Sequence, residues 1–347
     1  MHRLRILVVI TVTMLVLLVS GQALAQGDSI VIKIAGKESK LENISLGKEG
    51  WDSVRYKVSS GPGSRWQDEP TENVVDVIHG NQPQRFSNAE KYRKNGNWKS
   101  AVQEYQGCIK HERKEWVKIY AQYYLAESLR MWGKTEPSKR EEAIKEFEVF
   151  KSKYSDHRFI PSALYGLGLV AQATGNTGKA KNAFDDLGGG KYGQSWEVRG
   201  QYYSILLTGG SVSKLEKLIS KARRLGMNDI VAAARLGLAQ ALLKNTKYRD
   251  AMKKFKEIVS DPEGVGKEVL AAAHNGLGDC YVKLGSREDD KKKALFEYLK
   301  VVTLYASARD EYIYALGKAI DLLGEIGGDA YKDRIADLRK ELANTKR

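Results

Sequence analysis

From Pro83 onward, apolar residues recur every three or four positions, and polar residues occupy the places between them. Such spacing puts the apolar side chains on one face of an α-helix. Proline is rare in this part of the chain while alanine and leucine are frequent, which favours uninterrupted helices. The pattern therefore predicts a helical domain over residues 81–345.

Before residue 80, apolar residues alternate with polar ones or gather in short β-branched runs, as they do in half-buried strands. Four such segments are predicted: Ser29–Ile34, Leu41–Leu46, Asp52–Val58 and Asn73–Ile78. Four short strands in about 50 residues are typical of a small SH3-like or Sm-like barrel. We expect this β sub-domain to span residues 26–80 and to be marginally stable alone, because so short a chain buries little surface.

Within the helical part, small residues recur at the same place in successive units. They are separated by 37, 42, 71, 39 and 39 residues, and they are Ala89, Ala126, Gly168, Ala239, Gly278 and Gly317. The interval of 71 spans two units, and a degenerate helical pair from Trp196 to Gly226 fills it. Recurrence at periods of roughly 20–50 residues indicates a solenoid of repeated units. About seven helical pairs are predicted here.

A second alanine and an aromatic ring follow five of those small residues. The five combinations are Ala101-x3-Tyr105, Ala143-x3-Phe147, Ala180-x3-Phe184, Ala251-x3-Phe255 and Ala294-x3-Tyr298. We expect paired helices to approach closely where a small residue on one faces a small residue on the other. The ring lies four positions after the alanine, on the same helical face, and is expected to fill the gap to the next pair.

The connections between paired helices come in two lengths. Three are short and contain Gly96, Gly175 and Asn245, residue types that tolerate a positive φ angle. Two are longer, with additional residues at 134–142 and 286–292. Because both insertions are charged and polar, we interpret them as lengthened turns.

Leu277-Gly278 with Tyr281, followed by Ala294-x3-Tyr298, resembles the L-G-x2-Y and A-x3-F pattern of the tetratricopeptide repeat (TPR). The resemblance implies a mainly α chain, with an α-α superhelix formed by a TPR-like solenoid of about seven hairpins after the small β sub-domain. Residues 143–187 further resemble the repeats of two bacterial envelope families. These are the periplasmic Tol–Pal cell-division coordinator and the lipoprotein of the outer-membrane barrel assembly machine.

The chain departs from both envelope families. It has no lipoprotein cysteine near its amino terminus, and it lacks the amino-terminal coiled coil of the Tol–Pal coordinator. The resemblance therefore implies an envelope-associated adaptor without identifying a specific family.

The first 25 residues have the three parts of a secretory signal peptide. Arg3 and Arg5 make the start positive, residues 6–19 are apolar apart from two threonines, and Ala23-Leu24-Ala25 presents small residues to a signal peptidase. The apolar run of about 14 residues is shorter than the ~20 that a spanning helix needs. We predict export to the periplasm or beyond with cleavage after Ala25, and retention as an uncleaved anchor is the alternative.

The chain is basic, with 57 Lys and Arg against 43 Asp and Glu. Its net charge of +14 falls to +12 without Arg3 and Arg5. The charge is spread over the helical region and accompanies no nucleic-acid-binding motif, so no specific nucleic acid is expected. A positive chain can still associate with anionic surfaces. Binding to an anionic envelope polymer or membrane surface is therefore an alternative function.

In stacked hairpins of the TPR type, the first helices line a concave groove that holds the partner. Counting from the small residues, the resemblance places these residues in the groove: Tyr120, Tyr123, Glu127, Arg130, Tyr165, Gln172, Gln240, Asn275, Asp279, Lys283 and Tyr314. Tyrosine offers a large, stiff contact surface with one hydrogen-bonding tip. Packing of these tyrosines between hairpins is the alternative. The predicted function is a scaffold that binds protein or peptide partners, and the oligomeric state is left open.

No combination of residues typical of an enzyme stands out. The histidines lack zinc-ligand spacing, and Gly188–Lys191 lacks the G-x4-G-K-[ST] order of a phosphate loop. We therefore predict no catalytic activity, metal or cofactor. Cys108 and Cys280 fall several hairpins apart, beyond the reach of a disulfide, and are interpreted as small core residues.

Overall fold

The computed structural model describes residues 27–34, 36–58 and 65–345. These described residues divide into two compact units, of which the first holds those up to Glu49 together with those between 53 and 83. The second holds residues 50–52 and the chain from Gln84 onward. The predicted signal peptide and its cleavage point lie outside the described residues. Within those residues, none of the helices combines the length and the hydropathy that a bilayer crossing requires.

The first unit is an antiparallel sheet of five strands in the order β4-β3-β2-β1-β5. The strands are β1 Asp28–Ile34, β2 Lys37–Glu49, β3 Ser53–Val58, β4 Gln67–Pro70 and β5 Val74–Ile78. The first four form a meander, and β5 returns to pair with β1 after a single turn of 3₁₀ helix at Thr71–Asn73. Its buried core includes Ile30, Val54 and Tyr56. The small β sub-domain before the helices is therefore confirmed.

The strand β4 was missed by the sequence analysis. Its sequence is Gln67-Asp68-Glu69-Pro70, without a β-branched or aromatic residue, and it lies at the edge of the sheet. Two hydrogen bonds of 3.0 Å from the guanidinium of Arg55 on β3 join the carboxylate of Asp68. An edge strand of polar residues shows no hydrophobic alternation, which is the signal that sequence analysis detects.

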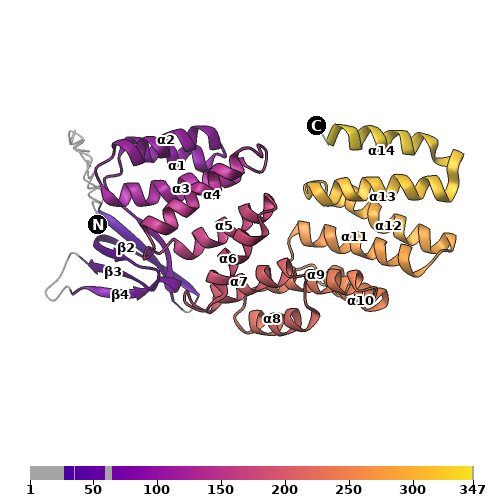
Figure 1. Ribbon diagram of the computed structural model, residues 1–347, viewed down its shortest axis with the longest axis horizontal. Coiled ribbons are helices and arrows are strands. Elements are labelled where there is room, and N and C mark those ends of the chain that lie inside the picture. The colour runs from indigo at the N-terminus through magenta and orange to yellow at the C-terminus, as the bar shows by residue number, and fades with distance from the viewer. Residues whose placement is uncertain (1–26, 35, 59–64, 346–347) are drawn as a thin grey trace, which may run out of the picture. The chain divides into compact units, whose positions relative to one another are not determined.

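The second unit consists of fourteen described helices in seven consecutive pairs (Figure 1). They are α1 Gln84–Lys94, α2 Trp98–His111, α3 Glu115–Trp132, α4 Lys139–Lys153, α5 Ile160–Ala173, α6 Thr177–Gly188, α7 Gln194–Leu207, α8 Val212–Arg224, α9 Asn228–Lys244, α10 Tyr248–Ser260, α11 Lys267–Leu284, α12 Glu288–Leu304, α13 Arg309–Gly327 and α14 Lys332–Thr345. Each helix packs against the next, and first helices also contact each other, as α9 does α11 and α11 does α13. The predicted solenoid of about seven hairpins is confirmed.

All five predicted alanines and their aromatic partners are buried, and rings of the second helices also lie against glycines of the first helices. A Cβ atom added to Gly168 would overlap the ring of Phe184 in the same hairpin. A Cβ atom on Gly166 would come within 2.5 Å of the ring of Phe147, in the preceding hairpin. The ring of Phe147 therefore fills the gap to the next hairpin, as expected, and the ring of Phe184 also packs against the first helix of its own hairpin. Each ring fits there, because glycine in the first helix leaves room for it.

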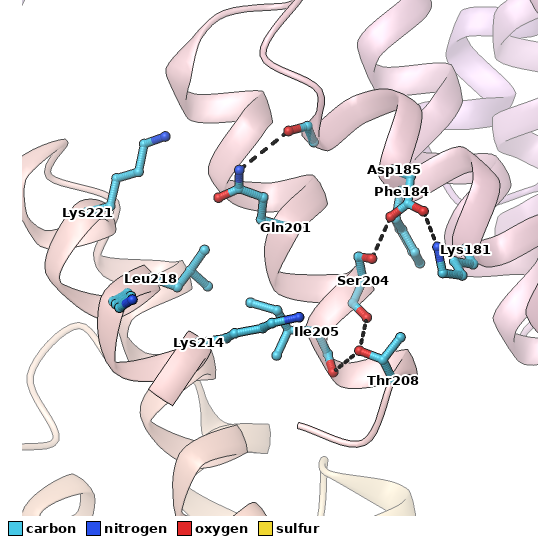
Figure 2. Close-up of a pocket in the computed structure, with 12 residues that line it drawn as sticks. Lys181, Phe184, Asp185, Gln201, Ser204, Ile205, Thr208, Lys214, Leu218 and Lys221 are labelled. Atoms are coloured by element: carbon cyan, nitrogen blue, oxygen red, sulfur yellow. Dashed lines mark hydrogen bonds and ion pairs between the residues drawn. The ribbon is translucent and has the colours of Figure 1, made fainter. Parts of the chain in front are cut away.

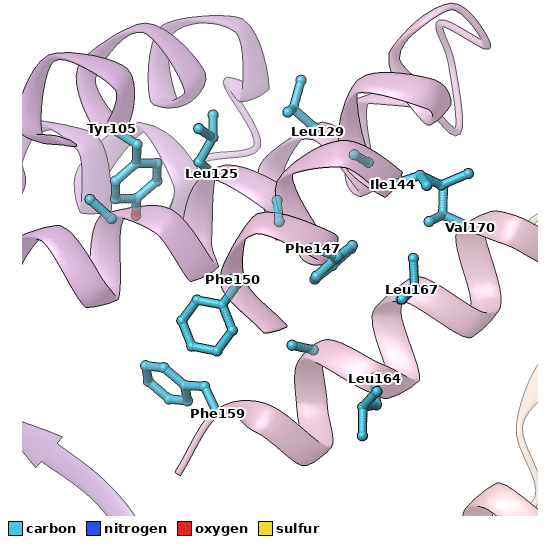
Figure 3. Close-up of a cluster of buried hydrophobic side chains, with 14 of the residues drawn as sticks. Tyr105, Leu125, Leu129, Ile144, Phe147, Phe150, Phe159, Leu164, Leu167 and Val170 are labelled. Atoms are coloured by element: carbon cyan, nitrogen blue, oxygen red, sulfur yellow. The ribbon is translucent and has the colours of Figure 1, made fainter. Parts of the chain in front are cut away.

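Buried side chains form three successive clusters along the helical unit. Figure 3 shows the first, in which Phe147 and Phe150 of α4 lie near Phe159 and the side chains of α5. Cys108 is a free, buried thiol of the first cluster, and Cys280 is one of the second.

The helix α7 contributes to two of the clusters. Trp196 packs against the first cluster, whereas Val198 and Tyr202 belong to the second, and Tyr203 packs against both. The degenerate pair predicted between Trp196 and Gly226 is thus α7 and α8. Its first helix, α7, contributes side chains to both the first and the second cluster.

The short turns share one backbone geometry. Gly96 and Gly175 have φ angles of +72° and +75°, as predicted. In the third turn Asn245 has an ordinary φ of −82°, and Thr246 instead takes the positive value, +60°. The prediction for Asn245 was therefore wrong by one position. Because a β-branched residue seldom adopts this conformation, sequence alone gave no reason to select Thr246.

The longer connections differ from each other. Residues 133–138 between α3 and α4 form a lengthened turn, as interpreted, whereas the insertion at 286–292 is mainly helical, which corrects the interpretation there. The helix α4 begins at Lys139 and α12 at Glu288, so most of the residues inserted at 286–292 extend α12. Acidic residues occupy the first turn of both helices. Negative charge there stabilises the positive end of the helix dipole, which explains why a charged insertion continues a helix.

Candidate functional site

Three predicted groove residues lie on one face of α11, at intervals of four. Asn275 is buried and donates its amide hydrogens to the backbone carbonyl of Glu311 on α13 at 3.0 Å and to its carboxylate at 2.7 Å. The Oδ1 atom of Asn275 accepts no hydrogen bond from the described residues. Asp279 is half-buried and Lys283 is exposed. This face of α11 therefore runs from the core into solvent.

Two tyrosine hydroxyls meet on one oxygen of Asp279. Tyr298 of α12 donates to Oδ1 at 2.6 Å, and Tyr314 of α13 donates to the same atom at 2.8 Å. Burial, together with the charge and hydrogen bond of Asp279, raises the pKa of both hydroxyls above its ordinary range. Both therefore stay protonated donors at neutral pH. The two bonds fix the carboxylate in orientation and join α11 to the next two helices.

Asp279, Lys283 and Tyr314 come together in a pocket of about 340 Å³. Exposed apolar surface is part of it, since Val282 is 43% exposed and Tyr314 is 40% exposed. Its charges are mixed, with Lys244, Lys283 and Lys318 beside Asp279, Asp321 and Glu325. A pocket with both signs of charge and a tyrosine wall matches a peptide, which carries apolar and polar groups close together, better than it matches a simple anion.

Two of the predicted groove tyrosines pack between hairpins. Tyr120 is buried, and its ring meets that of Phe159 edge-on at a centroid distance of 4.9 Å. The ring of Tyr123 stacks on the ring of Phe159, with 4.3 Å between the two centroids. Burial, then the charge of Glu127, raises the pKa of the Tyr123 hydroxyl. For these two residues the packing alternative describes the structure.

Tyr165 is half-buried, and its hydroxyl lies 3.0 Å from the hydroxyl of Tyr203 on α7. Glu127 and Arg130 form an ion pair of 2.8 Å along α3. The remaining two predicted residues, Gln172 and Gln240, are exposed at the ends of α5 and α9. The predicted set is therefore not one continuous surface of free side chains. Most of its members form two groups: Tyr123, Glu127 and Tyr165 interact with Arg130, and Lys283 and Tyr314 line one pocket with Asp279.

The pocket also contains residues that the sequence analysis did not select. Tyr298 was predicted as a core ring, but its hydroxyl reaches the pocket carboxylate. Val282 and Lys318 were missed as well. Lys318 lies four residues after Tyr314, and its ammonium is 5.5 Å from the centre of that ring, so the spacing of four could have indicated it. Among the described residues no group of three or more His, Cys, Asp and Glu side chains is placed to hold a metal ion.

Comparisons with known proteins find a likeness of structure. No protein-family model and no curated protein matches the chain. A tetratricopeptide repeat protein from Parabacteroides merdae is similar, with a TM-score of 0.50 and 17% identity, over 76% of this chain and 100% of that one. The apo form of RapI has a TM-score of 0.40 and 11% identity, over 76% of this chain and 75% of that one.

The TPR2AB-domain:pHSP90 complex of yeast Sti1 has a TM-score of 0.30 and 13% identity, over 75% of this chain and 97% of that chain. The seven helical pairs and the likeness to the Parabacteroides protein show that the chain has the tetratricopeptide-repeat fold.

Proposed function

We propose that the chain is an exported scaffold without catalytic activity that binds a protein or peptide partner in the pocket of α11 and α13 during cell-envelope assembly. The observation that carries the proposal is the convergence of Tyr298 and Tyr314 on Asp279. Exposed Val282 and Lys283 lie beside them. The pocket thus offers an aromatic surface, a fixed acceptor and an exposed cation within one recess.

The physical basis is pre-organisation. Binding costs less when the receptor groups are already held in place, because fewer side chains lose freedom on association. Asp279 is held by two hydroxyls, and the ring of Tyr314 is held in turn by its bond to Asp279. A partner backbone N–H or a basic side chain can therefore meet a carboxylate that does not need to reorient.

Photo-crosslinking tests the pocket. The photoreactive residue benzoylphenylalanine is placed at Val282 or Tyr314 in cells, and cross-linked products are compared with those from Phe296. Phe296 is a matched control, because it is an aromatic residue of α12 with 60% exposure that does not line the pocket. We expect the same partner to be captured from both pocket positions and not from Phe296.

A second variant tests whether capture of the partner depends on the charge of Asp279. Asp279→Asn removes the charge and keeps the shape, and we expect it to reduce capture at Val282 while circular dichroism stays unchanged. Equal capture from Phe296 and from the pocket positions, or capture indifferent to Asp279→Asn, would show that the partner binds elsewhere.

The proposal of export rests on the charged start, the apolar run and Ala23-Leu24-Ala25. We expect the protein in the periplasmic fraction to begin at Gln26. Mass spectrometry of its amino-terminal peptide measures this directly, and a peptide that still contains residues 1–25 would contradict it.

A further inference from the structure

A second recess lies between α6, α7 and α8, apart from the pocket around Asp279 (Figure 2). Its volume is about 670 Å³. Most of its accessible surface is apolar. Phe184, Ile205 and Leu218, one residue from each helix, border it, and each is at least nine-tenths buried. Polar groups of Ser204 and Thr208 follow along α7. We call this recess the α6–α8 cleft.

Four lysines surround the α6–α8 cleft, and they are Lys181, Lys214, Lys217 and Lys221. Two of them have acidic partners, because Lys221 pairs with Glu197 at 2.6 Å and Lys181 pairs with Asp185. Lys214 and Lys217 are exposed, and no carboxylate of the described chain pairs with either of them. In Figure 2 the side chain of Lys214 projects from α8 toward α7, over the apolar lining. The cleft therefore has two positive charges that the rest of the described chain does not neutralise.

The packing of the fourth hairpin explains why this recess exists. A Cβ atom on Gly200 would overlap the backbone at Gly188, so α7 lies in backbone contact with α6. In contrast, α7 and α8 contact each other more sparsely than the two helices of any other described pair. An open cleft consequently remains beside α7 and α8, and Ile205 and Leu218 lie beneath it with little exposed surface.

We propose that the α6–α8 cleft binds an acidic segment of a protein partner that carries apolar side chains on one face. Apolar residues of the segment fill the space above Ile205 and Leu218, and its carboxylates meet Lys214 and Lys217. An amphipathic segment satisfies both halves of the cleft at once, because burial of its apolar face and pairing of its charges occur in the same pose.

Other anionic partners fit the geometry less well. A bilayer is flat on this scale, so it would touch the lysines and leave the recess unfilled. A single-stranded nucleic acid needs an exposed ring on which bases stack, and Phe184 is completely buried. A small inorganic anion makes no use of the apolar lining. An acidic protein segment uses the charges, the lining and the recess together.

The test selects random dodecapeptides displayed on phage against the full mature protein, and then measures fluorescence anisotropy of a selected peptide. We expect enrichment of Asp and Glu three or four positions from Leu, Ile or Phe. The double variant Lys214→Glu with Lys217→Glu should weaken binding by about tenfold or more, since two attractive surface pairs become repulsive. The matched control is Lys253→Glu with Lys256→Glu on α10, which changes the net charge equally at residues outside the cleft.

A variant of unchanged charge tests the recess itself. Thr208→Trp places an indole in the cleft from an exposed position at the end of α7, and it should block the peptide as the lysine variant does. Peptides without acidic enrichment, or equal weakening by the α10 control, would overturn the proposal. Lysine-dependent sedimentation with phosphatidylglycerol vesicles that the peptide does not compete with would replace it with a membrane site. Capture at Tyr314 is not expected to change in any of these variants, so this test and that of the α11–α13 pocket fail separately.

Discussion

Gly168 and Gly317 occupy equivalent places in their repeats, yet their surroundings differ. A Cβ atom on Gly168 would overlap the buried ring of Phe184, whereas a Cβ atom on Gly317 would have no atom within 4 Å. The same substitution should therefore have opposite effects at the two positions. At Gly168 an added methyl group is expected to destabilise the fold because it would crowd the ring of Phe184. At Gly317 there is room for the methyl group, so the greater helix propensity of alanine is expected to stabilise the fold.

We expect Gly168→Ala to lower the free energy of unfolding by about 1–3 kcal/mol, the usual cost of overfilling a packed core. Gly317→Ala should raise it by up to about 1 kcal/mol, because alanine loses less backbone entropy than glycine in a helix. Urea denaturation followed by circular dichroism measures both. The double variant Gly168→Ala with Phe184→Leu should recover part of the loss, and a lack of coupling between the two would contradict the close contact.

The two free thiols predict how stability changes at alkaline pH. Burial raises the pKa of Cys108 and of Cys280 to about 12, from an ordinary value of 9.0. Because the folded-state pKa is the higher one, this contribution to stability is complete below pH 9.0 and is lost as pH rises toward 12. The loss has an upper limit of about 1.4 kcal/mol per pH unit for each thiol.

The measurement compares urea denaturation of the natural chain with that of Cys108→Ala plus Cys280→Ala between pH 8 and pH 11. The difference in free energy of unfolding between the two proteins should shrink as the pH rises, because only the natural chain loses this contribution. Tyrosines also ionise in this range, but they are common to both proteins and cancel. A difference that is independent of pH would show that the thiols do not contribute.

Among the turns between paired helices, the sequence of the third fits its conformation poorly. Asn97 and Asn176 cap the second helices of their hairpins with side-chain acceptors, each preceded by a glycine of positive φ. At the corresponding places, Thr246 adopts φ +60° and Lys247 provides no side-chain cap. A β-branched residue in the left-handed region costs of order 1–3 kcal/mol.

Thr246→Gly should accordingly raise the free energy of unfolding by about 1 kcal/mol or more. Lys247→Asn should add about 1 kcal/mol through a hydrogen bond to the start of α10. Thermal unfolding of the single and double variants checks both values. As a control, Gly175→Ala in the sister turn should be destabilising, and a stabilising effect there would contradict the shared geometry.

The helices were largely predictable because the signal of each is local. The alanines and rings at positions such as Ala180 and Phe184 repeat with a spacing that only packed hairpins explain, and the structure buries them as predicted. β4 was not predictable, since its residues are polar and it is held by partners on β3. The role of glycine at the crossings was also missed, because spacing identifies a small residue without showing which neighbour fills the space it leaves.

The candidate site could be predicted only in part, for a related reason. Asp279 and Lys283 follow from their interval after Gly278, but the rotation of Tyr298 toward Asp279 depends on how three helices pack. The lysines of the α6–α8 cleft lie on two helices that are separated by a third in the sequence. Their proximity is a property of the tertiary structure, and no pattern within one helix reveals it.

Across the solenoid, the hairpins are not equally well held. Packing is sparsest between α7 and α8, and local opening is most frequent where few contacts resist it. We therefore predict faster amide hydrogen exchange in α8 than in α6 or α10. Mass spectrometry after deuterium labelling measures this, and equal protection of the three helices would contradict it. A bound acidic peptide should slow exchange in α8 selectively.

The sparse packing of α7 against α8 also has a mechanical consequence. A stack of hairpins bends most easily at the hairpin whose two helices pack least tightly against each other. In the described helices this is the hairpin of α7 and α8, the fourth of seven, so we expect bending near the middle of the helical unit rather than at its ends. A ligand bound in the α6–α8 cleft would restrain α8 against its neighbours. The bending stiffness of the helical unit would then depend on whether this one cleft is occupied.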